Sequence, residues 1–148
     1  MIDWQLKLFK DLSHEELYSI MQLRQKVFIV EQNCPYLDAD GKDLHSYHLM
    51  GFVNNDLAAY ARLVFPGISY AEVSIGRVVT SPTYRKKEFG KQLMQRAIAK
   101  IENLYGKVPI RIGAQQYLKK FYESFGFVDL GKPYMEDGIP HIIMLRKI

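Results

Sequence analysis

Hydrophobic and polar residues follow one another in the first part of the chain with two different periods. Residues 4–9 alternate between apolar and polar side chains, which is typical of a strand with one buried face. Ser13 and Glu16 then fit a capping box, and an apolar helical face continues to about residue 32. The pattern therefore predicts a strand, a long helix and a loop over residues 33–44.

The middle of the chain has the pattern of an antiparallel meander. Two strand-like runs, residues 45–53 and 57–65, are separated by the turn-forming residues 54–56, which indicates a hairpin. A further turn at Pro66 leads to a third run over residues 71–80. Because consecutive strands usually lie side by side, we expect three neighbouring strands here.

The second half of the chain alternates between helices and strands. A basic turn is followed by a helix with a continuous apolar face that ends at Gly106. Residues 108–112 then predict a short strand, residues 115–125 a second helix and residues 141–145 a last strand. The predicted order is β-α-β-β-β-α-β-α-β. We expect an α/β (α+β) fold with a mixed, mostly antiparallel central sheet and helices on both faces.

The composition fits one folded domain over residues 1–148, with 48% hydrophobic and 24% charged residues. The net charge of +4 is too small to indicate a nucleic-acid partner by itself. The single cysteine, Cys34, excludes an intrachain disulfide and a cysteine-only metal site, and the histidines lack the spacing of zinc ligands. We therefore expect no bound metal.

No segment of the sequence indicates export or membrane insertion. Residues 1–7 lack the charged segment and apolar run of a signal peptide, and no stretch approaches the ~20 apolar residues of a membrane helix. These observations predict a cytoplasmic protein with no membrane partner. A homodimer that pairs the C-terminal strands of two copies is compatible with the sequence, which does not require it.

The junction between residues 77–80 and the helix that follows carries the strongest local signal. A strand runs into a polar turn that opens directly into a helix, so backbone N–H groups and the positive end of the helix dipole point to one place. Positive charge is added there by Arg85, Lys86, Lys87 and Lys91. The junction predicts a phosphate or pyrophosphate site, with an ordinary capped surface helix as the alternative.

The loop after the first helix is acidic. Carboxylates are concentrated there at Glu31, Asp38, Asp40 and Asp43, and only Lys42 opposes them. One interpretation is an acidic mouth that attracts a cationic amine. The other is a solvated surface loop, which is common for charged segments.

Two segments together resemble the signatures of the GNAT acyltransferases. The phosphate loop of that family reads Gln/Arg-x-x-Gly-x-Gly/Ala, and the matching run here is Arg85-Lys86-Lys87-Glu88-Phe89-Gly90, in which Glu88 replaces the first glycine. A second signature, Asn-x-x-Ala-x-x-Phe-Tyr-x-x-x-Gly-Phe, resembles residues 115–127. Gln115 takes its asparagine position and Tyr122 its tyrosine position.

Further segments are similar to the ElaA-like subgroup of this family. They are residues 24–36, 38–43, 76–79 and 136–141, so that the resemblance extends over nearly the whole chain. Membership of that subgroup does not define a substrate.

The resemblance implies an acetyl-CoA-dependent N-acetyltransferase in which a primary amine attacks the thioester directly, without an acyl-enzyme. It places the pantetheine of acetyl-CoA along residues 77–80 and the pyrophosphate on the basic turn. A backbone N–H near Val78 would polarise the thioester carbonyl, and Tyr122 would protonate the departing thiolate. The alternative for Tyr122 is a core aromatic residue with a satisfied hydroxyl. The cofactor-binding residues implied are Val78, Val79, Thr80, Arg85, Lys86, Lys87, Glu88, Phe89, Gly90, Lys91 and Gln115.

An ammonium acceptor needs a base, because a lysine-like amine has a pKa of ~10.4 and must lose a proton before it attacks. The candidates are Glu31, His48, Glu72 and His141. Glu31 is preferred because it lies near the end of the first helix, where the acceptor cleft of the family begins. Cys34 is expected to be a buried, inert thiol and not an acyl-carrying nucleophile.

Two other functions compete with the transferase. A CoA-binding sensor or interaction module without catalysis fits the replacement of the first loop glycine and the lack of an obvious base. A nucleic-acid binder using the helix after the basic turn is disfavoured, because the apolar face of that helix is expected to be buried. The acceptor stays open between a small amine, an amino acid, an aminosugar, a peptide N-terminus and a lysine side chain.

Overall fold

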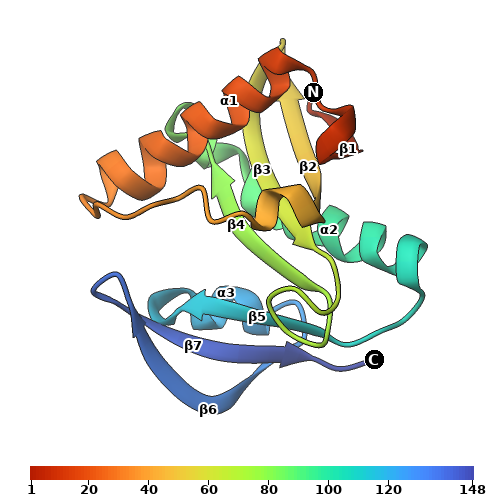
Figure 1. Cartoon of the computed structure of the whole chain (residues 1–148), viewed down its shortest axis with the longest axis vertical. Helices are drawn as coiled ribbons and strands as arrows, with labels where there is room; N and C mark the ends of the chain where they lie inside the picture. The colour runs from red at the N-terminus through yellow and green to blue at the C-terminus, as the bar shows by residue number, and fades with distance from the viewer.

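A computed structural model describes residues 1–148 and contains seven strands in two sheets (Figure 1). The first sheet has the order β1-β2-β3-β4, and the second has the order β5-β7-β6. Every named strand pair is antiparallel. The strands are β1 (Asp3–Leu8), β2 (Ser46–Val53), β3 (Asp56–Val64), β4 (Ser74–Thr80), β5 (Ile110–Gln115), β6 (Phe127–Glu136) and β7 (Ile139–Arg146).

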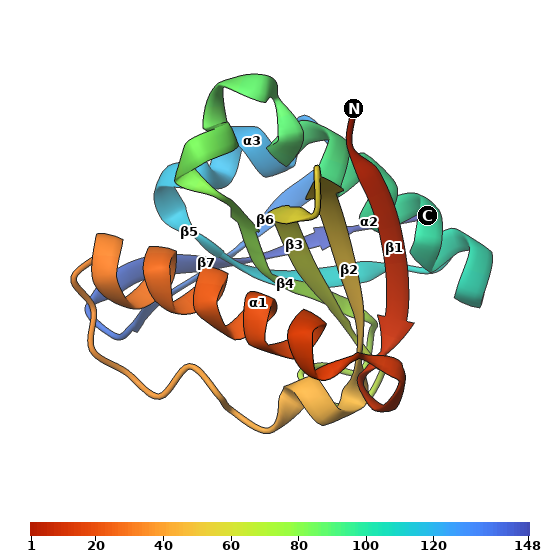
Figure 2. The same ribbon diagram turned by 90° about the horizontal axis from the view of Figure 1, so that it is seen from above.

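Helices lie on both faces of the strands, as the sequence predicts. Figure 2 shows α1 on one side and α2 and α3 on the other. The longer helical segments are α1 (His14–Arg24), η2 (Gln25–Glu31), α2 (Phe89–Tyr105) and α3 (Lys119–Glu123). Short 3-10 segments are η1 (Phe9–Asp11), η3 (Lys42–His45), η4 (Pro82–Lys87) and η5 (Gln116–Leu118). None of the helices combines the length and the apolar character needed to cross a membrane.

The two sheets meet at a single parallel bridge between Val73 and Ile110. There the backbone N–H of Arg111 donates a hydrogen bond of 3.1 Å to the Val73 carbonyl. Past this point β4 and β5 diverge, and a wedge opens between them (Figure 1). From Ser74 to Thr80, β4 therefore pairs with β3 on one edge only.

A β-bulge interrupts β4 beside this wedge. Tyr60 of β3 lies opposite Val79 and Arg62 lies opposite Gly76, so one residue of β3 faces two residues of β4. One of these two is Arg77, whose φ of 50° is unusual for a residue with a side chain. A bulge bends its strand and redirects side chains, and bulges are frequent near functional sites.

Two clusters of buried apolar side chains hold the layers together. The larger lies between the sheets and α2 and α3, and includes Leu93, Ile101, Ile112 and Phe127. The smaller lies under α1, where Ile20 and its neighbours contact β2, β3 and β4. The buried apolar face of α2 agrees with the sequence pattern.

One strand and two element boundaries differ from the sequence prediction. Residues 127–136 were not predicted as a strand, and they form β6, which contains Pro133. Proline is tolerated in β6 because this strand is the edge of its sheet and its pairing shifts between Asp129 and Pro133. Strand β5 also continues to Gln115, which shortens the predicted second helix to the 3-10 segment η5 and the one-turn α3.

The predicted first helix changes type along its length. Its start carries the predicted capping box between Ser13 and Glu16. After Arg24 the chain winds as a π-helix, in which the N–H of Gln32 bonds to the carbonyl of Val27 at 3.1 Å. π-Segments are rare and are often found at functional sites. Here the segment ends at the wedge between β4 and β5.

Candidate functional site

A cavity of about 380 Å³ occupies the wedge between the two sheets. Its walls come from β4, β5, the end of η2, the loop after it, η5, α3 and the turn between β6 and β7. Along one wall run Val78, Val79 and Thr80, on the edge of β4 that has no partner strand. Backbone N–H and C=O groups on a free edge can pair with an extended molecule, in the manner of an added strand.

The opposite wall of the cavity includes Gly113 of β5. A side chain at this position would collide with the hydroxyl of Tyr134 and come within 3.1 Å of the Tyr70 hydroxyl. Only glycine fits there without displacing these tyrosines. Gln115, further along β5, also lines the cavity, and its Nε2 lies 3.4 Å from Oε1 of Gln32 at the end of η2.

The basic turn closes one end of the cavity. Arg85 lines it directly, whereas Lys86, Lys87 and Lys91 are exposed beside it. Helix α2 begins after Glu88, and no side chain caps its first N–H groups. Such uncapped groups at a helix start favour an anion.

Glu88 occupies a left-handed backbone conformation, with φ 57° and ψ 26°. This explains why the related phosphate loops have glycine at that position, because glycine adopts the conformation without a steric penalty. The Glu88 side chain is exposed and lines no part of the cavity. Phe89 packs against the ring of Tyr84, and Gly90 lies beside Phe121.

Arg85 and Glu31 form a bidentate ion pair at the cavity. Arg85 Nη1 donates to Glu31 Oε2 at 2.7 Å, and Nη2 donates to Oε1 at 2.5 Å. The two hydrogen bonds from Arg85 lower the pKa of Glu31. A carboxylate engaged in this way is a weak base. The role of Glu31 as the base stays a prediction, and in this arrangement the pair opposes it.

Tyr122 of α3 points its ring into the large core cluster and lines the cavity. Its side chain is 7% exposed, and Phe121 and Phe127 pack edge-on against it. Burial raises the pKa of its hydroxyl, which forms no hydrogen bond with another protein group. The residue is therefore a core aromatic whose protonated hydroxyl, unlike that of an ordinary core tyrosine, has no hydrogen-bond partner within the protein.

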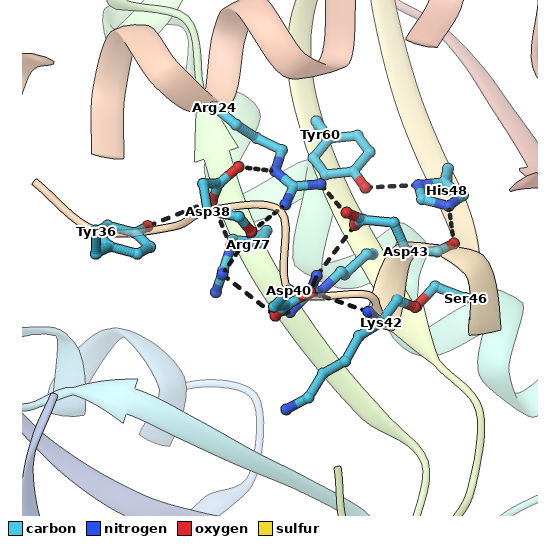
Figure 3. Close-up of polar contacts among 11 residues, drawn as sticks. Arg24, Tyr36, Asp38, Asp40, Lys42, Asp43, Ser46, His48, Tyr60 and Arg77 are labelled. Carbon is cyan, nitrogen blue, oxygen red and sulfur yellow. Dashed lines mark hydrogen bonds and ion pairs between the residues drawn. The ribbon is translucent and has the colours of Figure 1, made fainter. Parts of the chain in front are cut away.

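The acidic loop does not form the acidic mouth that the sequence suggested. Figure 3 shows its carboxylates turned inward onto arginines. Arg24, which is 0% exposed, donates from Nε to Asp38 at 2.9 Å and from Nη1 to Asp43 at 2.6 Å. Arg62 donates to Asp40 at 2.6 and 2.8 Å and to Asp43 at 3.1 Å.

A third arginine completes this cluster, which we call the arginine–aspartate network (Arg24, Arg62, Arg77, Asp38, Asp40 and Asp43). Arg77, in the β4 bulge, donates from Nε to Asp38 Oδ1 at 2.8 Å. Three cations thus balance three anions. Asp38 and Asp43 are buried and are not available to a cationic substrate, whereas Asp40 and Glu31 are partly exposed and are paired with Arg62 and Arg85. The signal for the network was an arginine inside the apolar run of β3, since a buried arginine requires a partner.

The network also sets the ionisation of its carboxylates. Burial alone would raise the pKa of Asp40, but the hydrogen bonds from Arg62 outweigh burial and hold the pKa well below its usual range. Asp43 behaves in the same way through its hydrogen bond from Arg24. Both groups therefore remain charged in the folded protein at neutral pH.

Two candidate bases lie away from the cavity. His48 is fully buried, with Nδ1 2.6 Å from the Tyr60 hydroxyl and Nε2 2.9 Å from the Asp43 carbonyl, and burial lowers its pKa. Glu72 forms a bidentate pair with Arg111 at 2.8 and 2.9 Å. Neither residue lines the cavity, so neither is placed to assist there.

The remaining candidates lie on the cavity wall near the β6–β7 turn. His141 lines it together with Glu136 and Asp137. Cys34 also reaches it, but the thiol is buried and donates a hydrogen bond of 3.1 Å to the Asp137 carbonyl. This agrees with an inert thiol that joins the loop to the turn. No three His, Cys, Asp or Glu side chains converge in a metal-binding arrangement.

Comparison with known proteins agrees with this geometry. Residues 11–148 match the model of the acetyltransferase (GNAT) domain. The chain belongs to the GNAT acetyltransferase family. It is therefore an acyltransferase of the GNAT type, as its sequence motifs and wedge-shaped cavity suggested.

The relatives of this GNAT protein include ElaA of Escherichia coli, which is 43% identical over 150 residues that cover 100% of the chain and 98% of ElaA. The crystal structure of E. coli ElaA superimposes with a TM-score of 0.92, covering 99% of this chain and 100% of that one. A structure described as an acyl-CoA N-acyltransferase from Pseudomonas aeruginosa has 44% identity, 99% coverage of both chains and a TM-score of 0.94. The resemblance to the ElaA-like subgroup and the predicted fold class are thus confirmed.

A more distant structure shares the fold alone. It is a GNAT family acetyltransferase from Elizabethkingia anophelis with acetyl-CoA bound, at 13% identity and a TM-score of 0.65, covering 99% of this chain and 98% of that one.

Replacement of Arg24 by Met should strongly destabilise the GNAT fold. The variant removes the fully buried cation that Asp38 and Asp43 share, so that Asp38 keeps only Arg77 and Asp43 only Arg62. Removing one member of a buried ion pair costs about 3–5 kcal/mol. The free energy of unfolding in urea measures the effect. The matched control is Lys10→Met at the exposed pair with Asp11, which should change stability by less than about 0.5 kcal/mol. Similar losses in both variants would contradict a structural role of the network.

The network should also make stability depend on acid pH. A carboxyl whose pKa is lowered by folding contributes stability that is complete above its unfolded pKa of about 3.9 and is lost as pH falls toward the folded value. The unfolding free energy should therefore fall below pH ~4, and less steeply in Asp40→Asn. Urea melts between neutral and acid pH check this. Asp11→Asn, at an exposed position, should follow the wild-type slope.

Proposed function

We propose that this GNAT protein transfers an acetyl group from acetyl-CoA to a primary amine by direct attack of the amine on the thioester. The observation that carries the proposal is the free edge of β4, which borders a cavity running between a buried tyrosine and an uncapped, basic helix start. A long, flexible thioester with an anionic far end fits this cavity, because its acyl end can lie near the tyrosine, its middle along the free strand edge and its anionic end at the basic helix start. The bound acetyl-CoA in the fold-related Elizabethkingia protein and the acyl-CoA activity named for the Pseudomonas relative are consistent with it.

The donor would lie along β4 with its amides paired to the backbone of Val78, Val79 and Thr80. Its pyrophosphate would accept hydrogen bonds from the first N–H groups of α2, at Phe89 and Gly90. The surrounding positive charge comes from Arg85, Lys86, Lys87 and Lys91. Glu88 would take part in pyrophosphate binding only through its backbone, because its negative charge is unfavourable there. Gln115 of β5 would border the donor on the other side.

Arg85 would exchange partners when the donor binds. Its guanidinium is engaged by Glu31, and its bidentate geometry suits a phosphate equally well. Phosphate and carboxylate therefore compete for one cation, and part of the binding energy goes into breaking the Glu31 pair. Donor binding would release the Glu31 carboxylate into the cavity.

The chemical step uses groups on both sides of the thioester. A backbone N–H near Val78 stabilises negative charge on the carbonyl oxygen as the amine nitrogen forms its bond to carbon. The C–S bond breaks and its electrons leave on sulfur. Tyr122 then gives the sulfur a proton. Burial that raises the pKa of the tyrosine also raises the pKa of a thiol in the same site, so the two shifts partly offset each other.

Calorimetric titration with acetyl-CoA and with CoA tests the donor site. We expect micromolar binding that weakens at least about tenfold in Arg85→Gln, since a charge-assisted bidentate contact is lost. The matched control is Arg96→Gln, which removes the same charge from the exposed surface of α2 and leaves the cavity untouched. No binding by the wild-type protein would refute the proposal. Equal affinities in the two variants would show that Arg85 acts only through net charge.

Replacement of Tyr122 by Phe should lower kcat and leave donor affinity unchanged. General acid catalysis contributes about 10²–10⁴-fold, so we expect a loss of at least about a hundredfold in thiol release with an accepted amine. Tyr117→Phe is the control, because this exposed tyrosine also lines the cavity. Binding of acetyl-CoA without turnover of any amine would favour the alternative, a catalytically silent CoA-binding module.

A further inference from the structure

His141 and Tyr122 reach the cavity from opposite faces of the second sheet. Side chains alternate between the two faces along a strand, and Ala114 of β5 joins Tyr122 in the large core cluster. Gln115 therefore points the other way, toward η2. His141 lies directly opposite Gln115 in the β5–β7 register and shares its face. His141 and Tyr122 thus approach the cavity from opposite sides, one on a strand and the other on a helix.

The orientation of the His141 ring is fixed by a backbone hydrogen bond. Nδ1 lies 2.7 Å from the carbonyl oxygen of Ile139. A carbonyl oxygen only accepts hydrogen bonds, so Nδ1 carries the hydrogen, and in the neutral ring the lone pair is on Nε2. The Tyr134 ring packs on the imidazole with centroids 5.3 Å apart and an interplanar angle of 32°.

Nε2 of His141 faces a carboxylate and no hydrogen-bond donor. Glu136 Oε2 lies 3.5 Å away, and the Glu136 side chain is 55% exposed. A neutral imidazole offers only its lone pair in that direction. A proton on Nε2 would allow a hydrogen bond to Glu136 and satisfy both groups.

Two other polar groups on this side of the cavity have partners before the donor binds. Glu31 is bound by Arg85, and the Cys34 thiol donates to the Asp137 carbonyl. Once the donor has displaced it from Arg85, the Glu31 carboxylate is still a weaker base than a neutral imidazole. The titratable groups in contact with the imidazole are Glu136 and Tyr134 on β6. Those that line the cavity with it are Asp137 in the turn, Glu31, Cys34 and Tyr36 from η2 and the loop after it, and Arg77 of β4. Unlike these groups, His141 is a neutral base whose Nε2 lone pair is held in a fixed direction by the hydrogen bond at Nδ1.

From this geometry we infer that His141 is the catalytic base and that Glu136 is a positioning residue. The inference rests on the proposed acetyl transfer and adds that the acceptor arrives as a primary ammonium ion from the side of η2. Glu136 attracts the ammonium and stabilises the imidazolium after proton transfer. A carboxylate that aligns a histidine in this way assists it without touching the reacting atoms.

The proton balance of the reaction is complete with these groups. The ammonium gives one proton to Nε2, and the resulting lone pair forms the C–N bond while the C–S bond breaks. The sulfur takes the proton of Tyr122. The surplus proton on the new amide nitrogen passes to solvent, from which Tyr122 is protonated again, and His141 releases its proton to solvent.

The test compares His141→Gln with wild type, using n-butylamine and hydroxylamine as probes alongside the best amine from a screen. An ammonium acceptor depends on the base, whereas hydroxylamine is largely unprotonated at neutral pH. We expect kcat/KM with the ammonium acceptor to fall by about 10²–10³-fold in the variant, and the loss with hydroxylamine to be much smaller. The acidic limb of the pH profile should disappear, and the Kd of acetyl-CoA should stay within about twofold.

Three further variants separate the roles. His45→Gln, at an exposed histidine outside the cavity, should behave as wild type. Glu136→Gln should lose about tenfold and shift the acidic limb, because a positioning residue acts through the imidazole. Glu31→Gln should keep the acidic limb and bind acetyl-CoA at least as tightly, because Arg85 is freed.

The possible failures are distinguishable. If wild-type protein binds acetyl-CoA and acetylates an amine, and His141→Gln keeps the rate and the pH profile, the inference is overturned and the proposed function stands. Loss of the acidic limb in Glu31→Gln alone would transfer the role to Glu31. If wild-type protein neither binds acetyl-CoA nor releases thiol with any amine, both the inference and the proposed function fail. A melting temperature near that of wild type shows that His141→Gln is folded.

Discussion

The arginine–aspartate network is the interaction on which the architecture of the cavity depends. It connects α1, the loop after η2, β3 and the β4 bulge, and four of its six side chains are almost entirely removed from water, namely those of Arg24, Arg62, Asp38 and Asp43. Buried ion pairs recover little net free energy after desolvation, so a well-packed apolar cluster would stabilise the fold as well or better. An apolar cluster, however, does not impose a specific orientation on its members. Each guanidinium group donates hydrogen bonds to a carboxylate in a defined geometry, and this fixes where the loop crosses the sheet.

That position matters because Arg77 belongs both to the network and to the bulge. The bulge bends β4 just beyond the only bridge between the sheets, and the network holds its side chain from the α1 side. The opposite side of the same strand edge faces α2 and α3 and their apolar core. The wedge is therefore held open by two different kinds of packing, one polar and directional, the other apolar. A donor and an acceptor can then approach one point from separate sides.

Features that depend on neighbouring residues could be predicted from the sequence. The capping box, the hairpin around residues 54–56, the apolar face of α2 and the basic turn each follow from local spacing, and the family signatures identified the fold and the tyrosine of α3. Strand β6 was not predicted. Its Pro133 is acceptable because the strand lies on the edge of its sheet, and position in the sheet is not a local property.

Charge was misjudged for a similar reason. Counting carboxylates along the loop gave an acidic surface, whereas the arginines that neutralise them come from α1, β3 and β4, and are distant in sequence. The tautomer of His141 depends on a carbonyl two residues away and on the exact path of the backbone, which no residue pattern specifies. The ion pair between Glu31 and Arg85 spans 54 positions and was likewise invisible in the sequence.

The free edge of β4 has a further consequence for the behaviour of the protein in a crowded solution. An unpaired strand edge normally invites a second copy to add its own strand, which is the first step of edge-to-edge aggregation. Here the edge lies inside a narrow wedge whose other wall, at Gly113, is closely approached by tyrosine hydroxyls. A slender single chain can enter such a space, but a neighbouring sheet with its side chains cannot. The shape that admits a ligand therefore also protects the protein from self-association along this edge.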